Sequence, residues 1–143
     1  MAEIDDLPVT EFGFPGALRD TLVAAIMEGE KTSTSSTLVE YGVENEPLPV
    51  VGERYALVDS DEKRVAVLEI TDVQQLRLAD VPWEHARDEG EGYESVAQWR
   101  AGHESYWQSD DMRGFLDDPL FTVNDETIVV LERFVVVSRV AAA

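Results

Sequence analysis

A lysine and a threonine separated by two residues are the first side chains in this sequence that could do chemistry together. They occur in Gly29-Glu30-Lys31-Thr32-Ser33-Thr34-Ser35-Ser36, the Lys/Thr turn. A threonine hydroxyl can attack a carbonyl carbon, and a lysine can take its proton or stabilise the oxyanion that forms. Residues three apart point to opposite faces of a regular strand, so cooperation requires an irregular backbone. On spacing alone, a solvated connection between a helix and a strand is the simpler interpretation.

Two other groups of polar residues lie further along the chain. Glu89 and Glu91 alternate with glycines, which let a backbone approach a ligand closely. Trp99, Arg100 and His103 share one predicted helix. A helix end followed by a linker would also explain the first group, and a buried tryptophan with a hydrogen-bonded histidine the second.

A metal site is a weaker alternative for the same region. His85 and Glu89 stand one helical turn apart, and with His103 they could supply three ligands. We expect no metal ion and no cofactor.

The Lys/Thr turn follows a predicted helix and precedes a predicted sheet. Helical spacing of apolar residues from Gly16 to Glu28 predicts that helix, and Gly29 suits its end. Residues 37–52 are interpreted as a loop with a short strand at 38–41, because prolines, glycines and acids dominate them. Residues 54–58 and 64–76 are β-branched and apolar, which predicts a hairpin.

The second half of the chain predicts two helices and one long strand. Residues 79–88 have a helical pattern, and a second helix begins after Ser95, which forms a capping-box pattern with Gln98. An acidic loop containing a proline follows it. Residues 127–139 are apolar on both faces, as in a central strand. Because helices and strands do not alternate, we predict an α+β fold with a small, mainly antiparallel sheet or barrel flanked by helices.

Composition limits the possible functions. The 143 residues fit one domain at 12–138, with an acidic N-terminal tail at 1–11 and a C-terminal tail at 139–143. A formal charge of −19 disfavours binding to the phosphate backbone of DNA or long RNA. The chain has no cysteine, which excludes disulfides and thiol nucleophiles. It has no basic leader and no long apolar run, so we expect a cytoplasmic protein without a membrane partner.

Five short blocks in order resemble the signature of the ASCH-domain proteins, which have a PUA-like fold. They are Phe12-Gly13-Phe14, the first six residues of the Lys/Thr turn, Leu48 to Glu53, His85 to Gly92, and Trp99 to His103. Within the family, the chain resembles a branch of small bacterial N(4)-acetylcytidine amidohydrolases in a Lys, Thr and Glu motif. That motif carries over onto Lys31, Thr34 and Glu89. The branch has Arg where Ser36 stands here, and it lacks the helix with Trp99 and His103, so the substrate is left open.

The resemblance implies a hydrolase that removes an acyl group from the exocyclic nitrogen of a cytosine nucleoside. Thr34 would be the nucleophile. Lys31 would take the hydroxyl proton only if its amine is neutral, which requires burial to outweigh its acidic surroundings. Otherwise a charged Lys31 would stabilise the oxyanion, and Glu89 would be the base. By resemblance and composition, the residues expected to bind the substrate are Ser36, Tyr41, Glu91, Trp99, Arg100 and His103.

The alternative function is a module that binds a modified base or a short RNA. The ASCH domain was first proposed as an RNA-associated domain, and one branch of the family resembles a ribonuclease. The expected partner is therefore a small nucleoside-like substrate, with short RNA as the second possibility.

Overall fold

The computed structural model describes residues 4–140, which form five strands and seven helical segments. The strands are β1 (Val9–Thr10), β2 (Ser33–Thr37), β3 (Arg54–Val58), β4 (Arg64–Arg77) and β5 (Ile128–Arg139). The α-helices are α1 (Ala17–Met27), α2 (Leu38–Val43), α3 (Trp83–Asp88), α4 (Val96–Trp107) and α5 (Asp110–Leu116). Two short 3-10 helices are η1 (Ile4–Asp6) and η2 (Leu78–Asp80).

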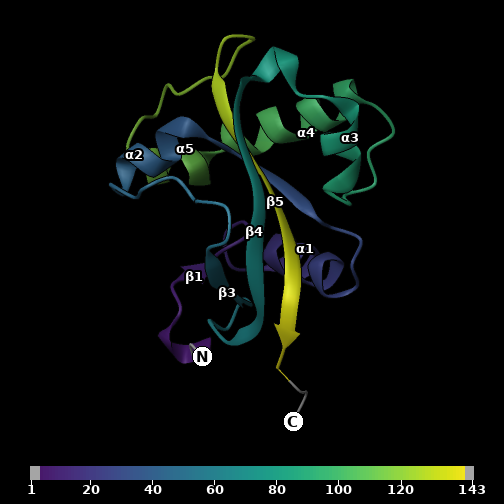
Figure 1. Cartoon of the computed structure of the whole chain (residues 1–143). Helices are drawn as coiled ribbons and strands as arrows, with labels where there is room; N and C mark the ends of the chain where they lie inside the picture. The colour runs from purple at the N-terminus through teal and green to yellow at the C-terminus, as the bar shows by residue number, and fades with distance from the viewer. Residues whose placement is uncertain (1–3, 141–143) are drawn as a thin grey trace.

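The strands form one open sheet in the order β1-β3-β4-β5-β2. Among the strands of the described residues only β1 and β3 pair in parallel, so the predicted α+β fold with a mainly antiparallel sheet is confirmed. The sheet does not close into a barrel, because β1 and β2 occupy its opposite edges. The long strands β4 and β5 cross most of the molecule side by side (Figure 1). Two register shifts between them mark irregularities of the kind that bend a strand.

Helices cover the sheet in two groups, each with its own core. Near α3, α4 and α5, the buried Trp99 and Trp107 pack with Val129 and Leu131 of β5. Near α1, Ile26 packs with a cluster that includes Phe134 of the same strand. Strand β5 therefore contributes to both cores, which explains why its residues are apolar on both faces.

The predicted helix before the Lys/Thr turn, the hairpin and the last strand are all present. The hairpin is β3 and β4, and the last strand is β5. Helix α4 begins after Ser95, whose hydroxyl accepts a hydrogen bond from the Gln98 N–H at 3.1 Å. The helix predicted at 79–88 is divided into η2 and α3.

Two segments differ from their predictions. Residues 38–41 are not a strand but part of α2, because Thr37 and Glu40 form a complete capping box. The acidic loop predicted after α4 contains α5, which Ser109 caps by accepting a hydrogen bond from the Met112 N–H.

The expected terminal tails are partly held by the sheet. Residues 1–3 and 141–143 lie outside the described residues. Within the expected N-terminal tail, β1 pairs with β3, and Arg64 donates hydrogen bonds to the carbonyl oxygens of Ile4 and Leu7. At the other end β5 extends to Arg139.

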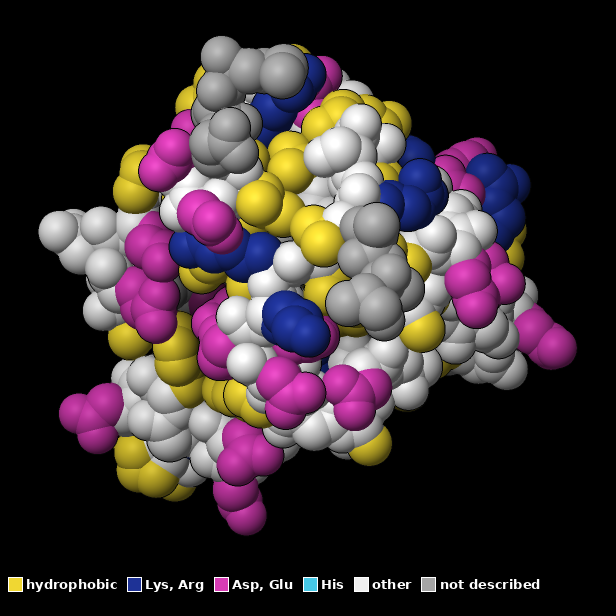
Figure 2. Space-filling view, turned by 90° about the horizontal axis from the view of Figure 1, so that it is seen from below, with side chains coloured by type: hydrophobic (Ala, Val, Ile, Leu, Met, Phe, Trp, Pro, Cys, Tyr) yellow, Lys and Arg dark blue, Asp and Glu magenta, His cyan; other side chains and the backbone are white. Residues whose placement is uncertain are grey.

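The surface reflects the acidic composition. In Figure 2, acidic side chains are distributed widely over the visible face, with separate Lys and Arg side chains between them. Within residues 4–140, no helix combines the length and the apolar character that crossing a membrane requires.

Candidate functional site

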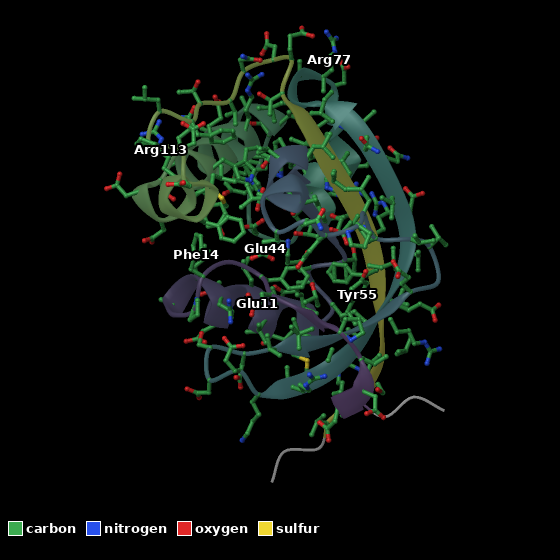
Figure 3. The ribbon with its side chains drawn as sticks, turned by 90° about the vertical axis from the view of Figure 1, so that its left-hand side faces the viewer. Glu11, Phe14, Glu44, Tyr55, Arg77 and Arg113 are labelled. Atoms are coloured by element: carbon green, nitrogen blue, oxygen red, sulfur yellow. The ribbon has the colours of Figure 1, made fainter. Side chains whose placement is uncertain are left out.

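A cavity of about 770 Å³ lies between the N-terminal segment, α1, β2, α2, α4 and β5. Around it lie Glu11 and Phe14 from the segment before α1, Glu44 at the end of α2, and Tyr55 of β3 (Figure 3). Lys31, Thr34 and Glu89 all line this cavity, so the predicted catalytic residues are brought together. The cavity is within the size range of ligand pockets for small molecules.

Lys31 is placed by the turn that ends α1. Gly29 has a φ of +82°, and the backbone N–H groups of Glu30 and Lys31 both donate to the carbonyl oxygen of Ala25. Lys31 therefore lies two residues before the start of β2 at Ser33, and its side chain and that of Thr34 both line the cavity.

The ammonium group of Lys31 is buried among acceptors. The side chain is about 1% exposed, and Nζ donates to the carbonyl oxygens of Ser33 at 2.9 Å and Glu89 at 3.3 Å. It also pairs with the carboxylates of Glu89 at 3.6 Å and Glu91 at 3.7 Å. Two carbonyl oxygens and two carboxylates therefore surround the amine, and the arrangement suits a fixed hydrogen-bond donor.

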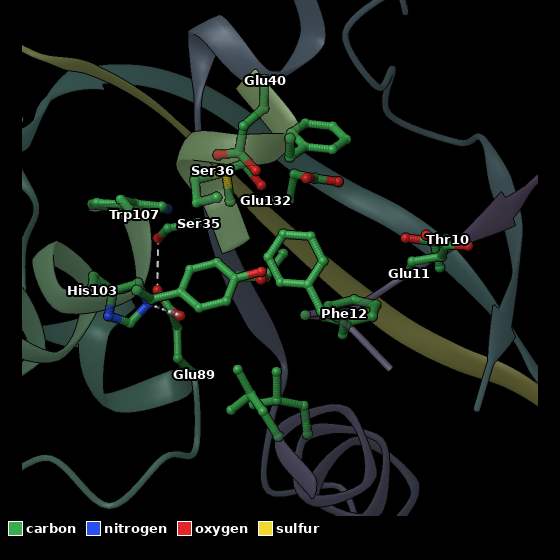
Figure 4. Close-up of a pocket in the computed structure, with 18 of the residues that line it drawn as sticks. Thr10, Glu11, Phe12, Ser35, Ser36, Glu40, Glu89, His103, Trp107 and Glu132 are labelled. Carbon is green, nitrogen blue, oxygen red and sulfur yellow. Dashed lines mark hydrogen bonds and ion pairs between the residues drawn. The ribbon is translucent and has the colours of Figure 1, made fainter. Parts of the chain in front are cut away.

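Glu89 is the most completely bonded group of the site. Its side chain is 1% exposed. Oε2 accepts hydrogen bonds from Ser35 Oγ at 2.6 Å and Trp99 Nε1 at 2.9 Å, and it lies 3.2 Å from His85 Nε2. Oε1 lies 3.1 Å from His103 Nε2 (Figure 4).

These partners keep Glu89 ionised. Burial alone would raise its pKa, but the hydrogen bonds from His103 and His85 and the charge of Lys31 hold the pKa well below the usual value. A carboxylate whose lone pairs are occupied and whose pKa is low is a poor proton acceptor. Glu89 is suited to hold Lys31 in place.

His103 and Glu91 complete one wall of the cavity, the first wall, which also contains Lys31 and Glu89. The His103 ring stacks on Trp99 with centroids 4.4 Å apart, and its Nδ1 lies 2.9 Å from the Trp99 carbonyl oxygen. Burial lowers the pKa of His103, but the hydrogen bond and charge of Glu89 and the charge of Glu91 outweigh it, and the pKa is raised. Burial raises the pKa of Glu91 and outweighs the charge of Lys31, which lowers it.

A close approach of two backbone segments explains why the residue after Glu89 is a glycine, Gly90. A Cβ at this position would lie 2.4 Å from the Glu30 carbonyl oxygen and 2.9 Å from Lys31 Cα. The φ of Gly90 is +69°, which also favours glycine. The backbones of the Lys/Thr turn and of the loop after α3 therefore touch directly. This contact fixes Lys31 and Glu89 relative to each other.

A second wall of the cavity carries a different set of polar groups. Thr34 on β2 pairs with Glu132 on β5, and both line the cavity. The Tyr41 hydroxyl donates to Glu132 Oε2 at 3.0 Å. Burial raises the pKa of Glu132 more than the Tyr41 hydrogen bond and the charge of Lys31 lower it. Burial and the nearby Glu132 also raise the pKa of Tyr41.

Most predicted site residues line the cavity, but two do not. The lining includes Lys31, Thr34, Ser36, Tyr41, Glu89, Glu91 and His103. Trp99 is fully buried behind it and contacts the lining residues Glu89, through a hydrogen bond, and His103, through stacking. Arg100 follows Trp99 on α4 and therefore faces another direction. It lies outside the cavity, where its guanidinium pairs with Asp125 and Glu104.

Two functional candidates were missed from the sequence. Ser35 donates to Glu89, and its Oγ lies 2.9 Å from His85 Nε2. Glu132 faces the cavity beside Thr34. The available signals were weak: Ser35 lies in a run of hydroxyl residues, and Glu132 is a lone acid near the middle of an apolar strand.

Three groups of the first wall have the spacing of a cation site. One ligand atom from each of Glu89, Glu91 and His103 lies within 4.8 Å of the others. Lys31, however, pairs with both carboxylates. Its ammonium supplies the positive charge that a metal ion would bring, so this donor set does not favour a metal.

Comparisons with known proteins give the family and the fold. A family model described as "ASCH domain" matches residues 9–138. The chain belongs to the ASCH domain family. No curated protein matches the chain.

Several solved structures are similar to this chain in fold. The ASCH domain from Lactobacillus crispatus JV V101 is 26% identical, with a TM-score of 0.78 over 92% of this chain and 80% of that chain. Protein EF3133 from Enterococcus faecalis V583 is 22% identical, with a TM-score of 0.80 over 94% and 78%. ASCH from Zymomonas mobilis is more distant, at 13% identity and a TM-score of 0.50 over 80% and 61%.

Proposed function

We propose that this ASCH domain protein is an amidohydrolase that removes an acyl group from the exocyclic nitrogen of a cytosine nucleoside. The observation that carries the proposal is the convergence of Lys31, Thr34 and Glu89 on one cavity. They come from positions up to 58 residues apart, and the Lys31 and Glu89 side chains are almost fully buried. The resemblance of the motif to N(4)-acetylcytidine amidohydrolases selects the substrate class.

In this mechanism Thr34 attacks the acyl carbon and forms an ester that water then hydrolyses. The charged Lys31 stabilises the negative oxygen of the tetrahedral intermediate, where a fixed charge in a site shielded from water is most effective. Glu89 orients Lys31 through their contact of 3.6 Å. In this proposal neither Lys31 nor Glu89 is the base. Lys31 stabilises the charge of the intermediate, and Glu89 orients Lys31.

The lining of the cavity favours a nucleoside over a nucleotide. Among the described residues that line it are seven glutamates and a single lysine. Such a field repels a phosphate group. Aromatic side chains supply flat apolar surface for a base, as at Phe12, Phe14, Tyr41, Tyr55, Tyr93 and Tyr106.

The test is incubation with N(4)-acetylcytidine and a panel of acylated nucleosides, followed by chromatography of the products. Lys31→Ala and Thr34→Ala should each lose at least about 100-fold in kcat/KM, because a charge stabiliser and a nucleophile are removed. Lys63→Ala and Thr32→Ala are matched controls at exposed positions and should retain activity. Absence of turnover with every substrate would refute the hydrolase.

The second candidate is a module that binds a modified base or a short RNA without turnover. The aromatic lining is the observation that favours it, because bases stack on aromatic rings without sequence preference. Nucleoside binding by an inactive wild-type protein would support this function. Binding to polymeric RNA should be weak and fall steeply with salt. Tight binding to polymeric RNA at about 200 mM salt would contradict the electrostatic argument.

A further inference from the structure

The proposed reaction needs a proton acceptor that the first wall of the cavity does not supply. Thr34 must lose its hydroxyl proton when it attacks. Lys31 is held by two carbonyl oxygens and two carboxylates, so its ammonium can donate but cannot accept. Glu89 already has Ser35, Trp99 and His103 as hydrogen-bond partners.

Glu132 is placed where that acceptor is needed. It is the direct cross-strand partner of Thr34 in the antiparallel pair of β2 and β5. Side chains of directly opposite residues share a face of the sheet, with Cβ atoms about 4.5–5.5 Å apart. Both residues line the cavity, and Figure 4 shows Glu132 beside Ser36 and Glu40, away from Glu89 and His103.

The carboxyl group of Glu132 is oriented but not saturated. Tyr41 donates to Oε2 at 3.0 Å, and within residues 4–140 no second side chain or backbone group donates to this carboxyl. Oε1 therefore has both lone pairs available for a substrate or for the Thr34 hydroxyl.

We infer that Glu132 is the general acid–base residue of this site and that Tyr41 positions it. The inference rests on the proposed function. It assigns proton transfer to the second wall and charge stabilisation to the first.

The proton balance of the reaction follows from this assignment. The Thr34 hydroxyl proton moves to the Glu132 carboxylate while Oγ forms a bond to the acyl carbon, and the carbonyl electron pair moves to the oxygen that faces Lys31. When the pair returns, the C–N bond breaks and the Glu132 proton moves to the leaving nitrogen. Water then attacks the ester and gives one proton to Glu132, which returns it to Thr34 Oγ as the C–O bond breaks. The products are the free amine and the carboxylic acid.

The surroundings of Glu132 act on its pKa in opposite directions. The charged or titratable groups near it are Lys31 before β2, Tyr41 and Glu40 on α2, and Tyr55 on β3. Burial raises the pKa of Glu132, while the Tyr41 hydrogen bond and the Lys31 charge oppose the shift. A raised pKa brings a carboxyl closer to the operating pH, where an acid–base group works best.

The first experiment compares Glu132→Gln with the wild type in turnover of N(4)-acetylcytidine across pH. We expect a loss of about 100-fold or more in kcat with little change in KM, and loss of the limb on the acid side of the pH profile. Glu69→Gln is the matched control, because Glu69 lies on β4 and pairs with Arg54 outside the cavity. Circular dichroism verifies that each variant is folded.

The second experiment uses Tyr41→Phe, which keeps the aromatic ring and remains informative if Glu132→Gln does not fold. Removing the donated hydrogen bond raises the pKa of Glu132, so the acid limb should move to higher pH. A purely structural Tyr41 would lower activity without moving that limb. A limb that stays in place would overturn the inference.

The two levels of proposal fail differently. If the wild type turns over the substrate and Glu132→Gln stays within threefold of it, the inference is overturned and the hydrolase stands. If the wild type turns over no acylated nucleoside, both the hydrolase and the role of Glu132 are refuted.

Discussion

Two of the carboxyl groups that line the cavity, the buried Glu89 and the half-buried Glu132, have different surroundings. Glu89 has Ser35, Trp99 and His103 within hydrogen-bonding distance, whereas Glu132 accepts from Tyr41. Burial pushes both pKa values upward, yet the pKa of Glu89 is held well below its usual value and that of Glu132 is raised. At Glu89 the hydrogen bonds from His103 and His85 and the charge of Lys31 outweigh burial, whereas at Glu132 burial outweighs the Tyr41 hydrogen bond and the charge of Lys31.

This difference divides the site by role. The shell around Glu89 comes from β2, α3 and α4, so Glu89 connects three elements and fixes Lys31. Glu132 lies within β5, which is held by its neighbouring strands without help from the carboxyl group. Removing the Glu89 carboxyl should therefore reduce stability more than removing the Glu132 carboxyl, whereas the loss of Glu132 should act mainly on activity.

The largest expected effect is on stability when each carboxyl is removed. Glu89→Ala leaves a buried lysine and several donors without their acceptor, so we expect a loss of about 3–5 kcal/mol in the free energy of unfolding. Glu132→Ala removes one hydrogen bond and should cost about 0.5–1.5 kcal/mol. Urea denaturation at neutral pH measures both. Equal losses would remove the distinction between the two walls.

The contact between Gly90 and the Lys/Thr turn gives the next largest effect. Gly90→Ala introduces a Cβ against the Glu30 and Lys31 backbones and should cost about 2–5 kcal/mol, from positive φ and overpacking together. Gly92→Ala is the control, because its φ is +85° but no atom lies within 4 Å of the added Cβ. It should cost about 1–2 kcal/mol. Equal melting temperatures for the two variants would contradict the role of the contact.

Neighbouring serines test the same division on a smaller scale. Ser35→Ala removes a hydrogen bond to the charged Glu89 and should cost about 1.5–3 kcal/mol. Ser36 is the next residue of β2 and faces the other side of the strand, so Ser36→Ala should cost less than about 1 kcal/mol. Thermal unfolding compares the pair. A larger loss for Ser36→Ala would show that the second wall stabilises the fold more than the first.

The smallest effect is the pH dependence of stability, which should have opposite signs for the two carboxyls. Glu132 has a raised pKa in the folded state, so it binds protons more tightly there, and its contribution to stability falls as pH rises from the usual 4.5 through the folded value. Glu89 has a lowered pKa, so its contribution is present above 4.5 and is lost as pH falls through the folded value. Urea denaturation of the wild type, Glu89→Gln and Glu132→Gln at several pH values isolates each term. Differences of the same sign would show that one of the two assignments is wrong.

Local patterns predicted much of the fold. Apolar residues at helical spacing predicted α1 and α4. Two β-branched and apolar segments joined by a polar turn predicted the hairpin of β3 and β4. Helix α2 was missed although Thr37 and Glu40 form a capping pattern, because the prolines and glycines after it indicated a loop. In the prediction, the loop-like composition of residues 37–52 outweighed the capping signal of two residues.

The site was predictable only where its residues belong to a motif. Lys31, Thr34 and Glu89 were chosen from their motif, and the structure places them around one cavity. Glu132 was not predicted, because its position beside Thr34 depends on the register between strands almost one hundred residues apart. Arg100 was misplaced because its neighbours on α4 do face the site, and only the rotation of the helix directs it elsewhere.

The turn before β2 also bears on how an edge of the sheet is protected. Strand β2 is an edge of the sheet, and the exposed backbone of an edge strand is a template for pairing with another chain. Here the Ser33 carbonyl oxygen accepts from Lys31 Nζ, the Ser33 hydroxyl donates to the His85 carbonyl oxygen, and the Thr32 N–H donates to the Asp88 carbonyl oxygen. The same contacts that build the cavity therefore cover this edge with α3, and losing them would expose a surface prone to aggregation.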